Sequence, residues 1–208
     1  MSINKFALSL ALAGILGATV AVAETSGAFV GVQGNTNFSS NINKSEADNG
    51  TNKNTNTQYQ IGVLGGYKFF FMPEVGVRAY GVLNYQNSQD KYDGSKDTDN
   101  TLGVSANVDG LYNFVSNESL DFGVFAGLSL GYTKLTNKEE RDARPSSKIT
   151  MSGFDPGINF GLRANVAQNH GLELYSRFGL ADIKKTENGV TEKSRTPYTV
   201  GLRYAYSF

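Results

Sequence analysis

The residues of this chain that could carry out catalysis are few and poorly combined. The sequence has a single histidine, His170, and no cysteine, which excludes a thiolate nucleophile, a disulfide framework and any metal centre built from several histidines. His170 stands between Asn169 and Gly171 in a segment that we expect to form a short turn. It lacks the nucleophile that a catalytic base needs within hydrogen-bonding reach. We therefore predict a turn role for His170 and no enzymatic activity.

An acidic stretch is the other candidate for chemistry. The segment QDKYDGSKDTDN carries Asp90, Asp93, Asp97 and Asp99, and loops rich in oxygen ligands can bind calcium. An EF-hand loop, however, spaces its ligands regularly and ends with a glutamate, whereas lysines interrupt the acids here and no glutamate closes the set. We interpret this stretch as a solvated loop, and we predict no metal and no cofactor.

Four acids and four arginines recur inside segments of alternating polarity, where they could resemble a catalytic cluster. Ionic networks that only support a fold also perturb titrating groups, so we interpret these residues as a structural network. They are Arg78, Asp109, Asp121, Asp155, Arg163, Glu173, Arg177 and Arg203.

Charge balance and the N-terminal segment narrow the class of protein. The chain has 19 Lys+Arg and 19 Asp+Glu, and this balance argues against a nucleic-acid partner, because phosphate recognition normally needs a basic excess or a clustered basic face. Residues 1–23 place Lys5 before an apolar stretch that ends in Ala-Val-Ala, the pattern of a secretory signal peptide. We predict cleavage before Glu24 and a mature domain of residues 24–208, exported from the cytoplasm.

The mature chain alternates in polarity with a period of two. No apolar run after the leader approaches the ~20 residues that a membrane-spanning helix requires. Instead, apolar groups occupy alternate positions over segments such as 59–71 and 102–114, which is typical of strands. A weaker run opens the mature chain at Ala28, Val30 and Val32. The segments predict eight strands.

The connections between these strands alternate in length. Short turns are expected near 72–73, 116–119 and 167–170, and long polar loops near 39–56, 86–100, 135–150 and 182–196. This layout indicates an all-β, eight-stranded antiparallel up-and-down transmembrane β-barrel, with short periplasmic turns and four longer extracellular loops. A water-soluble eight-stranded barrel would alternate as well, but its apolar face would line a ligand cavity.

Aromatic residues favour the membrane alternative. Threaded up and down, the strands place aromatic side chains at two levels that flank an aliphatic band, as at the two interfaces of a bilayer. The eight charged residues then face the interior, where they pair with one another away from lipid. The expected aromatic girdle comprises Tyr59, Tyr67, Phe69, Phe71, Tyr85, Tyr112, Phe114, Tyr132 and Tyr198.

The last strand ends with aromatics at alternate positions, Tyr204, Tyr206 and Phe208. It looks like the signal that the outer-membrane assembly machinery reads, and we expect that machinery as a partner during biogenesis. The same three side chains would also face lipid as part of the barrel wall.

Three segments resemble the Helicobacter-type outer-membrane proteins. They are ETSGAFVGV at 24–32, INFGLRANVAQNHGLELYSRFGL at 158–180 and the terminal TVGLRYAYSF, so the likeness covers the first strand and roughly the last quarter. The resemblance implies surface exposure in a family that includes adhesins and porins. The larger adhesins carry a big extracellular domain near the N-terminus, for which this chain has no room. In size and layout it is also similar to OmpA-like and opacity-like barrels.

The predicted barrel is compatible with two alternative functions. An eight-stranded barrel is just wide enough for side chains to fill its interior, which favours a non-enzymatic outer-membrane barrel with a structural or adhesin-like role through its loops. Lipid, lipopolysaccharide and a host-surface ligand are its expected partners, and it is expected to be a monomer. The alternative is a small channel or porin, because inward glycines such as Gly62, Gly157 and Gly161 would open the lumen.

Overall fold

The computed structural model describes the backbone of residues 24–45, 51–92, 95–117, 119–141, 144–181, 183–187 and 190–208, and the side chains of 24–38, 57–88, 98–117, 119–138, 150–181 and 196–208. Within these residues nine strand segments form one antiparallel sheet, and no helix is long and apolar enough to cross a membrane. The segments are β1 (Gly27–Ser45), β2 (Thr51–Phe70), β3 (Val75–Tyr92), β4 (Ser95–Ser116), β5 (Leu120–Arg141), β6 (Arg144–Val166), β7 (His170–Gly179), β8 (Ile183–Glu187) and β9 (Val190–Ser207).

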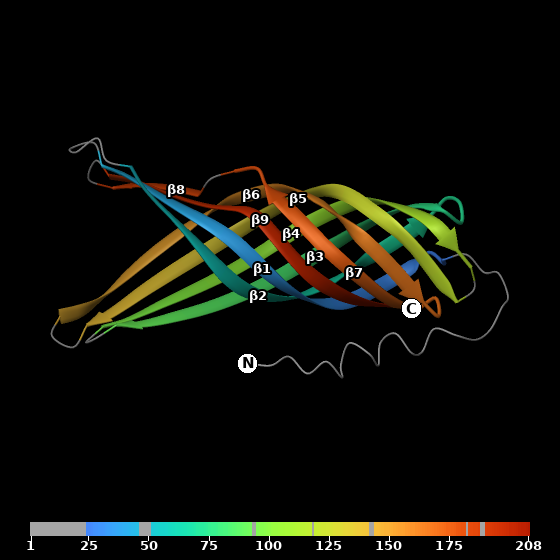
Figure 1. Cartoon of the computed structure of the whole chain (residues 1–208), viewed down its shortest axis with the longest axis horizontal. Coiled ribbons are helices and arrows are strands. Elements are labelled where there is room, and N and C mark those ends of the chain that lie inside the picture. Colours follow the sequence, from blue (N-terminus) through green and yellow to red (C-terminus); the bar gives the residue numbers. More distant parts are fainter. Residues whose placement is uncertain are drawn as a thin grey trace.

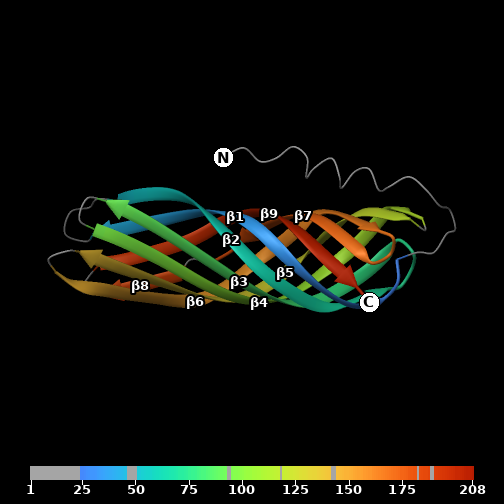
Figure 2. The same cartoon turned by 90° about the horizontal axis from the view of Figure 1, so that it is seen from below.

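The sheet closes into a barrel. Each strand from β1 to β6 pairs with the next one along the chain, β7 and β8 both pair with β9, and β9 pairs back with β1. Because β7 and β8 lie along successive parts of the same neighbour, they act as one interrupted strand, and the barrel is eight-stranded. Figures 1 and 2 show the strands wrapping obliquely around a common axis, as barrel closure requires. The predicted fold class is confirmed.

The interruption between β7 and β8 coincides with a proline in β9. Pairing of β7 with β9 ends at Tyr198, and pairing of β8 begins at Ser194. On the other side of β9, the ladder with β1 shifts register between Phe38 and Ser40 of β1. Pro197 lies in this stretch, and it has no N–H to donate to either ladder. Both ladders are therefore irregular at the same level.

The two faces of the barrel wall differ as a period of two requires. On β3, Val75 and Val77 are exposed, whereas Arg78 and Tyr80 are buried. The same alternation around the barrel leaves aliphatic and aromatic side chains on the outside and most of the polar ones inside. A polar interior behind an apolar outer band is the arrangement that a bilayer imposes.

One end of the barrel carries the C-terminus and the short connections β2–β3, β4–β5 and β6–β7, on the right in Figure 1. The β6–β7 turn holds Ala167 and Gln168 at positive φ angles of 51° and 65°, a conformation used in tight turns. The side-chain amide of Asn165 donates to the Gln168 carbonyl at 3.0 Å and fastens this turn. In outer-membrane barrels the end with short turns is periplasmic.

At the opposite end, most residues expected in long loops continue the strands instead. The β1–β2 ladder runs out to Lys44↔Thr51 and the β3–β4 ladder to Tyr92↔Ser95. Outside the membrane both faces of a sheet contact water, so a strand there does not need to alternate in polarity, and its sequence can look like that of a loop. A tilted strand spans the membrane with ~9–11 residues, whereas β6 has 23. The barrel therefore projects well beyond the bilayer on its extracellular side.

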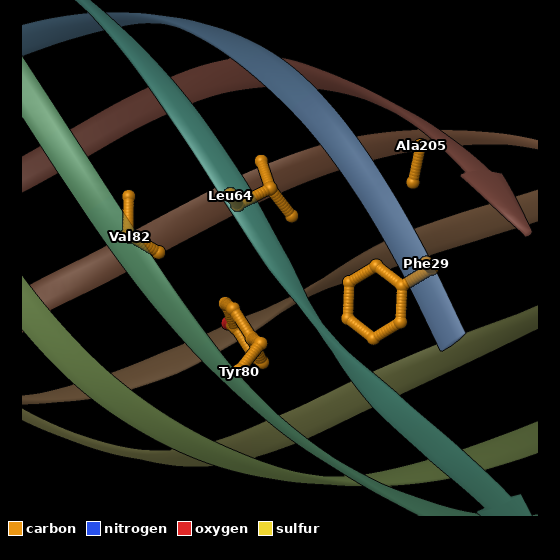
Figure 3. Close-up of a cluster of buried hydrophobic side chains, with 5 residues drawn as sticks. All are labelled: Phe29, Leu64, Tyr80, Val82 and Ala205. Atoms are coloured by element: carbon orange, nitrogen blue, oxygen red, sulfur yellow. The ribbon is translucent and has the colours of Figure 1, made fainter. Parts of the chain in front are cut away.

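The interior also contains apolar side chains, which the alternation of polarity in the sequence does not indicate. One cluster comprises Phe29, Leu64, Tyr80, Val82 and Ala205, and Figure 3 shows these side chains within the barrel, on strands β1, β2, β3 and β9. A second cluster combines Leu111, Phe125 and Tyr175, with Phe70 packed against it. Because these residues fill the space between the inward charges, the interior is a packed core.

Candidate functional site: two layers of buried charge in the barrel

The central layer is organised by an ion pair that crosses the lumen. Arg78 of β3 contacts Glu173 of β7 through both terminal nitrogens of its guanidinium. β3 and β7 are separated by three strands along the sheet, so the two side chains approach each other from opposite sides of the barrel. Arg78 is 4% exposed and Glu173 5% exposed. This pair therefore lies across the path that a solute would follow.

Further groups surround this pair. Arg78 also donates to Asp109 at 2.9 Å, and Arg203 donates to Glu173 at 3.0 Å. Arg203 also donates to the side-chain oxygen of Gln33 at 3.0 and 3.1 Å and to the Tyr80 hydroxyl at 3.3 Å. The two arginines and two acids have no net charge, and nearly all of their hydrogen-bonding groups are satisfied. This is the condition under which buried charges are tolerated.

Aromatic rings close the gaps between these charges. The Arg78 guanidinium lies 4.9 Å from the ring centre of Tyr80 and 4.6 Å from that of Phe125, and the Arg203 guanidinium lies 4.4 Å from that of Tyr175. These distances allow cation–π attraction. Charges and rings from β3, β5, β7 and β9 therefore lie together at this level of the barrel.

The second layer lies near the periplasmic end and depends on the first described residue. Glu24 precedes β1, and its carboxylate receives two hydrogen bonds from Arg163 of β6, at 2.6 and 2.7 Å. Lys68 of β2 donates to it at 2.8 Å, and Asn113 of β4 at 3.1 Å. The side chain of Glu24 has no exposed surface. The start of the described chain therefore enters the barrel mouth and joins three strands.

The charges around Glu24 determine its ionisation. Burial alone would raise the pKa of this carboxyl, but Arg163 and, to a smaller extent, Lys68 outweigh burial and lower the pKa from 4.5 to about 2. Glu24 is therefore ionised at every pH above that value. While Arg163 and Lys68 stay in contact with it, the carboxylate keeps its charge to a lower pH than an ordinary glutamate does.

The remaining predicted network residues lie apart from the central layer. Arg177 pairs with Asp155 at 3.0 Å towards the extracellular end, where both side chains keep some exposure. Asp121 accepts hydrogen bonds from Ser116 at 2.6 Å and from Asn165 at 3.4 Å near the periplasmic end. Arg78, Asp109, Glu173 and Arg203 thus meet in the central layer, while Arg163 belongs to the layer around Glu24.

Two of the inward glycines make room for larger neighbours. A Cβ on Gly161 would lie 2.8 Å from the ring of Phe125, and a Cβ on Gly157 would lie 2.6 Å from the Arg177 guanidinium. The space that each glycine vacates is thus taken by a side chain from an adjacent strand. These glycines therefore do not widen the lumen.

The aromatic residues expected at the membrane interfaces point outward. All nine are exposed or half-buried, from Tyr59 at 76% exposure to the half-buried Tyr198. Of the C-terminal aromatics, Phe208 is 71% exposed. His170 is the first residue of β7 and not part of the turn, and its Nδ1 lies 2.8 Å from the Tyr204 hydroxyl. His170 thus links the start of β7 to the C-terminal part of β9.

Several residues of the two layers were absent from the predicted network. Lys68 and Tyr80 alternate with the outward residues of their strands, so the period of two already predicts that both side chains face the interior. Gln33 and Asn113 are uncharged, so a search for inward charged residues does not identify them. Glu24 precedes the first strand, and no periodicity indicates where its side chain points.

Among the described residues, no group of three or more His, Cys, Asp or Glu side chains could hold a metal ion. The closed sheet, apolar outer wall and charged interior define an outer-membrane β-barrel. The chain belongs to the Helicobacter outer membrane protein family, whose model matches residues 62–208. No curated protein matches the chain.

Solved structures provide further comparisons of the fold. The outer membrane protein OprG from Pseudomonas aeruginosa is 16% identical, with a TM-score of 0.58 over 89% of this chain and 98% of that chain. A major outer membrane protein from Thermus thermophilus is 14% identical, with a TM-score of 0.48 over 87% and 99%. Ail, the attachment invasion locus protein of Yersinia pestis, is 13% identical, with a TM-score of 0.44 over 86% of this chain and 99% of that chain. That structure is a complex with the heparin analogue sucrose octasulfate.

Proposed function

We propose that this protein is a sealed, non-catalytic barrel whose extracellular extension makes structural or adhesive contacts at the cell surface. The observation that carries the proposal is the ion pair between Arg78 and Glu173, which joins opposite walls of the barrel while both partners stay buried. A water-filled pore would leave such side chains accessible to solvent. The lumen is therefore an unfavourable route for solutes, and we assign the function to the extracellular surface.

The extracellular extension supports this assignment. Four hairpins continue the barrel beyond the aliphatic band, and their sequences are rich in Asn, Ser, Thr and charged residues. The backbone of these hairpins continues the ladders of the barrel. Pre-organised polar surfaces lose less conformational entropy on binding than loose loops do. Host-surface ligands, lipopolysaccharide and other envelope components are the partners that such a surface suits.

A trimmed barrel tests the role of the extension. The β1–β2 and β5–β6 hairpins can each be closed by an Asn-Gly turn, one between Ser40 and Thr55 and the other between Asn137 and Ile149, which are directly paired residues. Such two-residue turns preserve the register of the remaining ladder. The probe is a labelled proteoliposome that carries either barrel, applied to cultured epithelial cells.

We expect the trimmed barrel to keep the heat-modifiable gel migration of a folded barrel and to lose cell binding. A matched barrel, in which the same two hairpins keep their length but have shuffled sequences, separates loss of specific contacts from loss of reach. Equal binding by the full and trimmed barrels, or by the full barrel and empty liposomes, would contradict the surface role.

A further inference from the structure

The periplasmic mouth of the barrel contains a set of donors that would suit a carboxylate from any source. Arg163 presents two nitrogens side by side, Lys68 an ammonium group and Asn113 an amide, and all of them converge on one point. Paired guanidinium nitrogens match the two oxygens of a carboxylate. The donors come from β6, β2 and β4, so the barrel itself fixes their positions.

These donors are buried. Arg163 is 6% exposed, Lys68 4% and Asn113 0%. Two cations buried together repel each other, and each loses hydration, so the arrangement requires an anion between them. The anion in this chain is Glu24, which no strand contains. It reaches the site from the segment before β1, where the Ser26 hydroxyl accepts a hydrogen bond from the Phe70 N–H at 2.9 Å.

We propose that Arg163, Lys68 and Asn113 form a carboxylate-binding site at the periplasmic mouth, and that the chain fills it with its own Glu24. The bound carboxylate fastens residues 24–26 across the mouth and closes it. The surface role proposed above does not require this site, since it depends on the extracellular end. Without Glu24 the same donors bind a free carboxylate.

Chemical rescue tests this proposal on the refolded chain of residues 24–208. Glu24→Ala removes the internal carboxylate, and its unfolding midpoint is followed in sodium acetate and in sodium chloride of equal ionic strength. We expect the variant to lose stability, and acetate but not chloride to restore part of it with saturation. Glu74→Ala, which removes an exposed carboxylate from the β2–β3 turn at the same end, is the matched control and should show neither effect.

A second readout uses a conservative variant that keeps the shape of the side chain. Lys68 should be protected from an amine-acylating reagent in the wild type and labelled about tenfold faster in Glu24→Gln, because loss of its charged hydrogen bond corresponds to about 1.4 kcal/mol. Acetate should restore its protection. Lys134, which is exposed in the barrel wall, should be labelled equally in both proteins and provides the internal reference.

Three results would overturn the site. Wild-type stability in Glu24→Ala would mean that the carboxylate does not fasten the mouth. An acetate effect of equal size in Glu74→Ala and Glu24→Ala would mean that acetate acts on the whole protein. Continued protection of Lys68 in Glu24→Gln, which remains measurable if Glu24→Ala does not fold, would mean that Glu24 does not hold the site together.

Discussion

The central and periplasmic layers place buried charge across the same lumen by different means. In the central layer every charged group lies on a strand, so the register of the sheet places Arg78 opposite Glu173. In the periplasmic layer the cations lie on strands but the carboxylate of Glu24 comes from outside the sheet. The first layer is therefore as stable as the barrel, whereas the second depends on the segment that precedes β1.

The two layers also act in series. A solute that passed Glu24 at the mouth would still meet Arg78 and Glu173 further in. Loss of one layer alone should leave the lumen closed, and conductance should require the loss of both. Gly161 does not open a path beside these layers, because the ring of Phe125 occupies the space next to it.

The largest effect is expected from Glu173→Ala in the central layer. It leaves Arg78 and Arg203 buried without their shared carboxylate, and removing one partner of a buried ion pair costs about 3–5 kcal/mol. The urea midpoint of the refolded barrel measures the loss. Asp155→Ala, at a pair with some exposure, should cost about 0–1 kcal/mol. Similar losses in both variants would mean that burial does not distinguish the two pairs.

The second largest effect is expected from Glu24→Ala in the periplasmic layer. Hydrogen bonds to charged groups contribute about 1.5–3 kcal/mol, and the cations left at the mouth can be rehydrated more easily than those in the central layer. The same urea titration should therefore give a smaller loss than for Glu173→Ala. A larger loss would reverse the ranking of the two layers.

Packing around the central layer predicts a third difference, between two glycines. A Cβ on Gly161 would meet the backbone oxygen of Leu174 and the ring of Phe125, whereas a Cβ on Gly157 would meet the flexible end of Arg177. Gly161→Ala should cost about 1–3 kcal/mol through overpacking, and Gly157→Ala less, because the guanidinium can move. Thermal midpoints of the two variants test this, and equal midpoints would contradict it.

The last difference concerns the pH dependence of the periplasmic layer. The pKa of Glu24 is about 2 in the folded chain, against an ordinary value of 4.5, so its ionised form stabilises the fold above pH 4.5. That contribution should decline as the pH falls from 4.5 towards 2. The difference in stability between wild type and Glu24→Gln, measured across this range, should shrink accordingly. A difference that stays constant down to pH 2 would mean that Glu24 does not titrate with the fold.

The membrane-spanning part of the fold could be predicted from sequence because lipid outside and charge inside impose a strict alternation of polarity. That alternation predicted the strand count, and it assigned Arg78, Asp109, Glu173 and Arg203 to one face. It failed beyond the membrane, where both faces of a strand are wet and the residues around Lys44 and Thr51 look like a loop although they pair.

The contacts inside the barrel required the structure. Alternation assigns Arg78 and Glu173 to the interior, but only the sheet order shows that they meet across it. The position of Glu24 could not be predicted, because a residue outside the ladder has no register. Inward apolar residues such as Phe125 were missed because a polar interior was assumed. A narrow lumen excludes water, and apolar side chains then pack there as in any core.

The most direct test is the single-channel conductance of refolded residues 24–208 in a planar bilayer, with heat-modifiable migration as proof of folding. We predict a silent bilayer for the wild type and for Glu173→Ala and Glu24→Ala alone, and discrete openings only when both substitutions are combined. Steady, discrete openings of the wild-type barrel would show that the two layers do not seal the lumen, and would favour a channel.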